Sequence, residues 1–170
     1  MMRRIGSLLG VCLLAGGCVV PTAVPSNRDP LPPGSAPTPT EGALESDIHQ
    51  LVNRHRAARR LPPLEWDPRI ADAAREHSRA MAEGRRAFGH DGFEERAEAV
   101  RRFMAIRSLA ENVAYDSRTG PQLATHVVDG WIASTGHRQN IEGGSTHTGI
   151  GVARNAEGVR YFTQIFVGAN

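Results

Sequence analysis

The chain has no lysine, only two cysteines, and no apolar run long enough to cross a bilayer as a mature helix. All 20 basic residues are therefore arginines, and they are scattered rather than gathered beside stacking aromatics. Two of them lie in the first four residues, so that 18 remain to balance 18 acidic residues. A near-neutral chain without a basic patch is not expected to bind nucleic acid.

The first 17 residues have the pattern of a lipoprotein signal peptide. A positive start, Arg3-Arg4, precedes an apolar stretch over residues 5–14, and small residues follow directly before Cys18. We expect cleavage before Cys18 and acylation of its thiol, which would anchor the protein to a membrane. Ordinary secretory cleavage that leaves a free Cys18 is the alternative, because the large aliphatic Leu14 lies one place further from the cysteine than usual.

The expected location is the bacterial cell envelope, on its periplasmic or cell-surface side. Val19 and Val20 follow the anchor and carry no acidic signal for retention at the inner membrane, which favours the outer membrane. Seven of the 11 prolines lie in residues 21–40, so residues 18–40 are predicted to be an extended, disordered tether.

Loss of the signal peptide removes Cys12 and leaves Cys18 as the only thiol of the mature chain. No intramolecular disulfide can then form, although the compartment would permit one. The domain over residues 41–170 must therefore be held by its core alone, and about 130 residues suffice for that.

Hydrophobic periodicity predicts an α+β domain. Apolar residues recur at helical spacing, whereas the C-terminal stretch alternates like a hairpin whose turn lies at residues 155–158. We expect helices over residues 43–59, 68–83, 94–104 and from 121 to about 135, and strands over 109–115, 148–154 and 159–167. Amphipathic helices on both faces of a small antiparallel sheet would form a three-layer α/β/α sandwich.

Residues 131–151 concentrate polar side chains that a plain core would not use. The apolar helical pattern stops at Thr135-Gly136, and we expect a polar loop carrying His137 and His147 before the next strand. Two upstream motifs are similarly rich in polar residues, Phe88-Gly89-His90-Asp91 and Ala110-Glu111-Asn112-Val113.

Together with the C-terminal Tyr161-Phe162-Thr163-Gln164, these motifs resemble the CAP superfamily of cysteine-rich secretory, antigen 5 and pathogenesis-related proteins, in its cysteine-poor bacterial branch. The resemblance covers about residues 43–168 and implies the same α/β/α sandwich. It also implies a cleft in which two histidines and two glutamates can bind a divalent metal. Matched motif by motif, these are His90, Glu111 and His137, while Ser134 stands at or next to the place of the second glutamate.

Two imidazoles and a carboxylate suit Zn²⁺ with water in a fourth position, and such a water can act as a nucleophile near neutral pH. Glu111 and His137 are therefore the catalytic candidates, and His90, Glu111 and His137 the metal candidates. In the alternative, His90 and His137 each bond a carbonyl or carboxylate and lock the loops. Glu142 is a weak substitute for the missing glutamate.

A hydrolase built from Ser134, His137 and Glu111 is a further alternative, but Ser134 has no nucleophile-elbow context and is better explained as a helix terminus. His77 lies on the apolar face of its helix and is expected to be a hydrogen-bonded core residue. Asn112 and Asn140 are expected to bond the backbone, and Arg138 to pair with Glu111 or Asp91 or to be solvated.

Two function classes follow. In the first, the cleft binds a lipid, a glycan or a partner protein, with or without a divalent metal. Its predicted residues are His90, Glu111, Asn112, Ser134, His137 and Arg138. Aromatic residues are candidates for lining such a groove, although a core role is the expectation for each: Phe88, Phe93, Tyr115 and Tyr161. In the second class, the protein is a metal-dependent hydrolase with an extracytoplasmic substrate.

Overall fold

The computed structural model describes residues 38–169, so the predicted signal peptide, Cys18 and almost all of the tether lie outside the described residues. The helices and strands follow one another in this order: α1 (Glu41–Ala58), β1 (Glu65–Trp66), α2 (Pro68–Ala82), α3 (Phe93–Arg101), β2 (Ile106–Asp116), α4 (Leu123–Ala133), α5 (Thr135–Glu142), β3 (His147–Arg154) and β4 (Arg160–Ala169). No helix within residues 38–169 combines the length and apolar character needed to cross a membrane.

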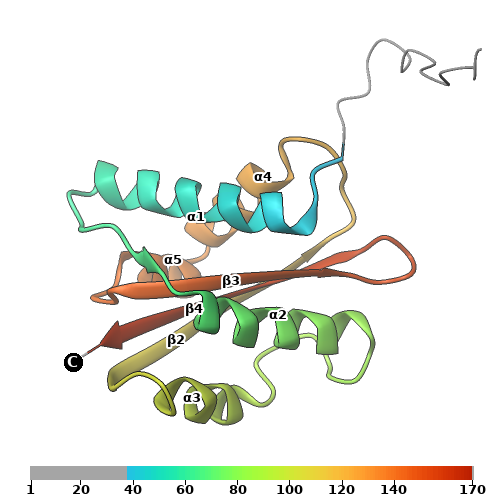
Figure 1. The fold of residues 1–170 in the computed structure, drawn as a ribbon. Helices are drawn as coiled ribbons and strands as arrows, with labels where there is room; N and C mark the ends of the chain where they lie inside the picture. The colour runs from blue at the N-terminus through green and yellow to red at the C-terminus, as the bar shows by residue number, and fades with distance from the viewer. Residues whose placement is uncertain (1–37, 170) are drawn as a thin grey trace, which may run out of the picture. The chain divides into compact units, whose positions relative to one another are not determined.

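The sheet has the strand order β1-β3-β4-β2 (Figure 1). The β3–β4 hairpin and the β2–β4 pair are antiparallel, as the sequence predicts. β1 adds a short parallel edge that the sequence does not reveal, because two residues are too few to show a pattern. β4 lies between β3 and β2 and pairs with both, so the C-terminal strand is central to the sheet.

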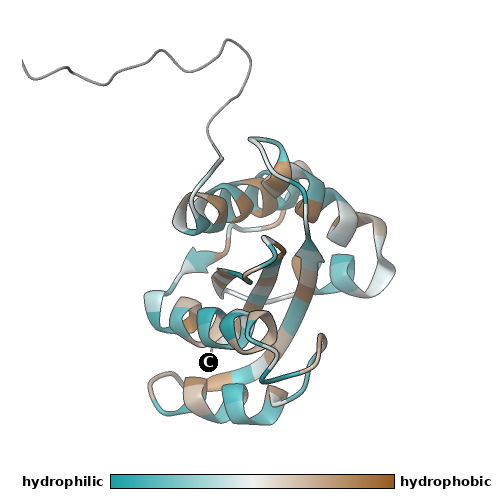
Figure 2. Ribbon diagram, turned by 90° about the vertical axis from the view of Figure 1, so that its right-hand side faces the viewer, coloured by the Kyte–Doolittle hydropathy of each residue, from teal (hydrophilic) through white to brown (hydrophobic). Residues whose placement is uncertain are grey.

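Helices cover both faces of this sheet, which confirms the three-layer α/β/α sandwich. α1, α4 and α5 lie on one side and α2 and α3 on the other (Figure 1). One apolar cluster packs under α1 and α4, around Trp131 and Phe166, and a smaller one packs under α2 and α3, around Ile70 and Ile165. Hydrophobic and hydrophilic residues alternate along the helices, as expected for elements with one face on a core and the other in water (Figure 2).

The contact between α2 and β3 depends on two glycines. A Cβ atom on Gly149 would lie 2.1 Å from the Ala71 nitrogen, and one on Gly151 would lie 2.1 Å from the Arg75 nitrogen. The helix backbone therefore rests directly on the strand, and Ser78 Oγ donates a hydrogen bond to the Gly151 carbonyl at 2.9 Å. This close approach sets the height of α2, and hence of His77, above the sheet.

Most predicted helices agree with the structure to within two or three residues. α2 begins as predicted, with the Asp67 side chain accepting from the Arg69 N–H and Pro68 in the first turn. The prediction was wrong over residues 135–142, where the expected polar loop is helix α5. Only Ile141 of α5 is buried, so no apolar periodicity marks this helix.

Candidate functional site

A buried carboxylate, Glu111 on β2, is the centre of the candidate site. Only 5% of this residue is exposed, and Arg96 on α3 donates two parallel hydrogen bonds to its carboxylate. Arg96 Nε donates to Oε2 at 2.7 Å and Nη2 donates to Oε1 at 2.8 Å. This bidentate geometry is the strongest kind of ion pair that side chains form.

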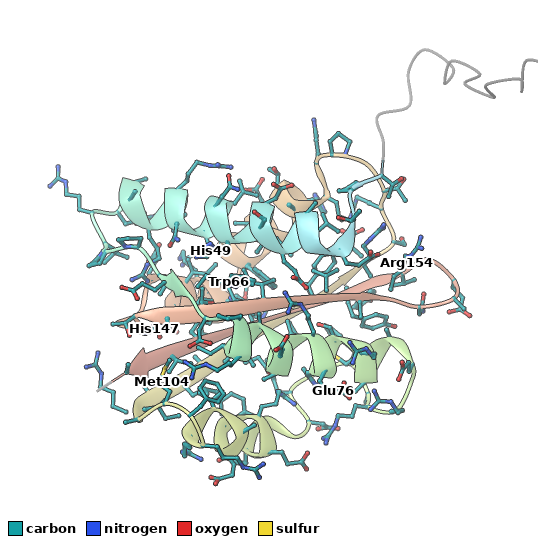
Figure 3. All side chains as sticks on the ribbon, viewed as in Figure 1. His49, Trp66, Glu76, Met104, His147 and Arg154 are labelled. Atoms are coloured by element: carbon teal, nitrogen blue, oxygen red, sulfur yellow. The ribbon has the colours of Figure 1, made fainter. Side chains whose placement is uncertain are left out.

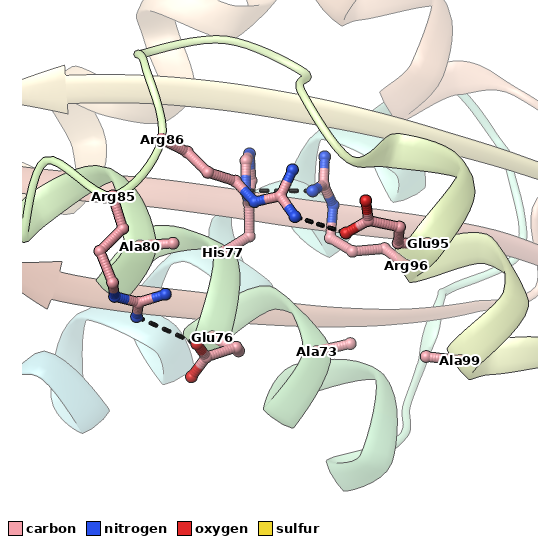
Figure 4. Close-up of a pocket in the computed structure, with 9 residues that line it drawn as sticks. All are labelled: Ala73, Glu76, His77, Ala80, Arg85, Arg86, Glu95, Arg96 and Ala99. Atoms are coloured by element: carbon pink, nitrogen blue, oxygen red, sulfur yellow. Dashed lines mark hydrogen bonds and ion pairs between the residues drawn. The ribbon is translucent and has the colours of Figure 1, made fainter.

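Arg96 also holds the loop between α2 and α3. Its Nη1 donates to the Asp91 carbonyl at 2.8 Å, and its Nη2 lies 3.3 Å from the His90 carbonyl. The same Nη1 lies 3.1 Å from His77 Nδ1 (Figure 4). One guanidinium thus joins a strand, a helix and a loop.

His90 receives its orientation from Glu111. His90 Nδ1 lies 2.9 Å from Glu111 Oε1, and a carboxylate only accepts, so Nδ1 carries the proton. Its Nε2 has no hydrogen-bond partner within residues 38–169, and the side chain is 53% exposed. Glu111 thereby fixes which ring nitrogen of His90 is left without a protein partner.

His77 is a buried, hydrogen-bonded core residue, as the sequence predicts. Its Nδ1 faces the Arg96 donor and must accept, so its Nε2–H donates to the Gly89 carbonyl at 2.9 Å. Desolvation by burial lowers the pKa of His77, and the positive charge of Arg96 lowers it further. His77 is therefore a neutral support for the loop that carries His90.

His137 lies on α5 rather than on a loop, and it is half-buried. Burial lowers its pKa, and the nearby His90 lowers it further. His137 lines a pocket of ≈ 360 Å³ together with Tyr115, Trp131 and Ser134. Within residues 38–169 no hydrogen bond reaches its ring, so a neutral imidazole faces this pocket without a partner.

Two asparagines fasten α5 to β2. Asn112 Nδ2 donates to the His137 carbonyl at 3.1 Å, and Asn140 Nδ2 donates to the Glu111 carbonyl at 3.2 Å. Asn140 Nδ2 also lies 2.9 Å from Asn112 Oδ1. The backbone positions of Glu111 and His137 are thereby coupled.

The remaining candidates have other roles. Arg138 does not pair with Glu111 or Asp91, and donates instead to the Ile132 carbonyl at 2.8 Å. Glu142 does not approach the cleft, because its carboxylate lies 2.8 Å from His55 Nε2. His147 begins β3, at the opposite end from Arg154 (Figure 3), and lies 3.4 Å from Glu65 beside the β1 edge of the sheet.

Ser134 lies at the junction of α4 and α5 without a side-chain capping bond, at a helix terminus as expected. In the described part of the chain, no hydrogen bond joins Ser134 to His137 or His137 to Glu111. Glu111 orients His90 instead, so the acid, base and hydroxyl of a serine hydrolase are not connected here.

Zinc ligands are also incompletely assembled. No three His, Cys, Asp or Glu side chains in residues 38–169 form a group that could hold a metal ion. Both oxygens of Glu111 already accept from Arg96, and one also accepts from His90. His90 Nε2 and the ring of His137 remain without hydrogen-bond partners in residues 38–169.

Tyr115, which lines the same pocket as His137, belongs to a group of three aromatic rings. Phe88 packs edge-on against Tyr115 with centroids 4.9 Å apart, and Tyr115 lies 6.2 Å from Tyr161. Phe88 is 48% exposed and Tyr115 is 60% exposed, so the expected core role is wrong for both. They are the large hydrophobic residues that the described surface exposes.

The family model for CAP, the cysteine-rich secretory protein family, matches residues 49–166. The chain therefore belongs to the CAP family. It is 33% identical over 129 residues to the uncharacterized membrane protein YlbC of Bacillus subtilis. The matched region covers 72% of this chain but only 34% of that protein.

Solved structures share the fold. A cysteine-rich secretory protein of Staphylococcus aureus superposes with a TM-score of 0.60 at 19% identity, covering 79% of this chain and 42% of that one. An extracellular protein of Bacillus anthracis with an SCP domain gives 0.57 at 28% identity, covering 78% and 45%.

The lowered pKa values of His77 and His137 predict that the protein loses stability in mild acid. As the pH falls below the ordinary histidine pKa of about 6.5, protons bind the unfolded chain before they bind these two side chains. The free energy of unfolding, measured with urea, should be level above that pH and should decrease below it. Asp67 and Glu142, whose pKa values are also lowered, add to the loss only in stronger acid.

The variant His77→Gln should reduce the slope of stability against pH between about 6.5 and 5, because it removes one of the two side chains whose pKa is lowered. A wild-type stability that stays level or rises over that interval would contradict the assignment of neutral, desolvated histidines.

Proposed function

We propose that this CAP domain is the ligand-binding part of a lipid-anchored protein of the bacterial cell envelope. Its ligand is a lipid or a glycan with an apolar face. The observation that carries the proposal is the exposed aromatic pair Phe88–Tyr115 beside a pocket that Tyr115 shares with the unpaired ring of His137. Aromatic rings of this kind bind apolar faces, and the His137 imidazole can bond a polar group beside them.

Binding has more support than catalysis. A general base or nucleophile needs a free, activated group, but the Glu111 carboxylate is fully engaged by Arg96 and His90. His137 lacks the orienting acid that a triad requires. The metal-dependent hydrolase therefore remains the second candidate, supported only by the two free imidazoles.

Those two imidazoles alone would be the protein ligands of a bound Zn²⁺. His90 Nε2 and His137 are the donors that fit it, while Glu111 would act by orienting His90. A two-donor set binds Zn²⁺ less tightly than the three or four protein ligands of established sites. Bound Zn²⁺ would supply a Lewis acid at the open end of the cleft.

The envelope location is supported by the N-terminal pattern and by the names of relatives. Residues 1–17 have the features of a lipoprotein signal peptide, one relative is called a membrane protein, and another an extracellular protein.

We predict that the full chain expressed in a Gram-negative host incorporates labelled palmitate and sediments with membranes. Cys18→Ala should abolish both; palmitate incorporation by Cys18→Ala would refute the anchor.

The cleft is tested with the mature chain, residues 18–170, carrying Cys18→Ala to avoid lipidation. Calorimetric titrations with lauric acid, chitotetraose and Zn²⁺ probe an acyl chain, a glycan and a metal. We expect saturable binding of lauric acid or chitotetraose, weakened about tenfold, or 1.4 kcal/mol, by Phe88→Ala with Tyr115→Ala. His90→Ala with His137→Ala should abolish any binding of Zn²⁺.

Hydrolysis of p-nitrophenyl acetate, with and without Zn²⁺, separates the two function classes. The proposal predicts no turnover that depends on His137. Zn²⁺-dependent turnover lost in His137→Ala would favour the hydrolase, and failure of both organic probes to bind would reject the lipid or glycan ligand. Phe103→Ala, beyond the end of α3 and packed against the smaller apolar cluster, serves as the aromatic control.

A further inference from the structure

A second pocket, separate from the cleft, lies between α2, the loop that follows it and α3. Its volume is ≈ 350 Å³, which falls at the lower end of the range of small-molecule sites. His77 and Arg96 form part of its wall, whereas His90, Glu111 and His137 do not line it. The pair that supports the cleft therefore also borders this pocket.

The pocket combines a small apolar surface with charges of both signs. Three alanines line it, Ala73 and Ala80 from α2 and Ala99 from α3. Two ion pairs stand at its rim: Arg85 Nη2 lies 3.0 Å from Glu76 Oε1, and Arg86 pairs with Glu95 (Figure 4). Each side of the opening thus offers one guanidinium and one carboxylate.

We infer that this pocket binds a small zwitterion, an amino acid or dipeptide with a free ammonium and a free carboxylate. The ligand carboxylate would bind Arg85 or Arg86, the ammonium would bind Glu76 or Glu95, and small side chains would pack on the alanines. A purely anionic or purely cationic ligand would displace one member of a rim ion pair and leave its former partner without a counter-charge.

The rim can exchange its partners at little cost. Glu76, Glu95 and Arg85 each have at least half of their side-chain surface exposed, and exposed ion pairs contribute about 0–1 kcal/mol. A zwitterion that separates one such ion pair forms a new contact with each of the two separated side chains. Little binding free energy is therefore lost. The inner wall, in contrast, is fully bonded, because Arg96 and His77 already have partners.

The loop over residues 83–92 connects the pocket to the cleft. It carries Arg86 at the pocket and His90 at the cleft, and the Arg86 guanidinium lies directly over Gly92, where a Cβ would be 2.2 Å from Nη1. Gly92 and Gly89 both have positive φ, so the loop's path depends on residues with little steric restriction. A ligand that binds Arg86 changes the surroundings of Gly92 and of the loop that carries His90, so the His90 signal reports binding.

Titration followed by NMR tests the inference on residues 18–170 with Cys18→Ala. The probes are alanine and the dipeptide Ala-Ala, and the control is N-acetyl-Ala-Ala-amide, which has the same methyl groups but no charges. We expect saturable shifts of the Arg86, Glu95 and His90 signals with a Kd in the millimolar range or tighter, and none with the control. Binding of Ala-Ala but not of alanine would assign the site to dipeptides.

Two variants report on pocket and charge separately. Ala99→Leu fills the pocket and Arg86→Gln removes one rim charge, and each should weaken binding about tenfold or more. Ala57→Leu, on the exposed face of α1, should leave it unchanged. The inference is overturned if neither zwitterion saturates the signals, if the uncharged control binds equally well, or if both pocket variants bind like the wild type.

Discussion

Burial of the Glu111 carboxylate is the constraint on which the site depends. A charged group this far from water is strongly unfavourable unless a counter-charge and hydrogen bonds replace its hydration. Arg96 provides both with one planar fork, and His90 provides a third bond. Removal of either charged partner would leave the other buried and unpaired, so β2 and α3 are held together by this requirement.

The same pair determines the chemistry of the cleft. Because Arg96 uses its remaining donors on the His90 and Asp91 carbonyls, the loop arrives at a fixed position, and Glu111 then sets the tautomer of His90. His137 reaches the cleft on α5, which Asn112 and Asn140 fasten to β2. Two imidazoles are therefore presented by elements that the core already holds, which suits a preformed binding site.

Much of the fold was predictable from the sequence, because periodicity and caps act locally. Asp67-Pro68 marked the start of α2, and the alternation around Phe162 marked the C-terminal hairpin. α5 was not predictable, since it buries one residue and is bonded to β2 by Asn112 and Asn140 rather than by an apolar stripe. The motif resemblance indicated His90, Glu111 and His137, and the structure brings the first two into contact.

Arg96 was missed for a physical reason. It follows Glu94-Glu95, and a charged run at the start of a helix is usually solvated. Only the three-dimensional contact with Glu111, 15 residues away, shows that this arginine faces inward. A buried acid in a strand that has no basic neighbour in sequence is a signal to search for such a distant partner. Phe88 and Tyr115 were likewise misplaced in the core, because sequence alone does not distinguish exposed aromatic pairs from buried ones.

The most direct test of this account is the ¹⁵N NMR measurement of the His90 ring at neutral pH. The nitrogen shifts distinguish the two neutral tautomers and the imidazolium. The Arg96–Glu111–His90 arrangement predicts that Nδ1 of the ring carries a proton, which it donates to the Glu111 carboxylate. A ring with its single proton on Nε2 would show that Glu111 does not orient His90, and would contradict the central claim.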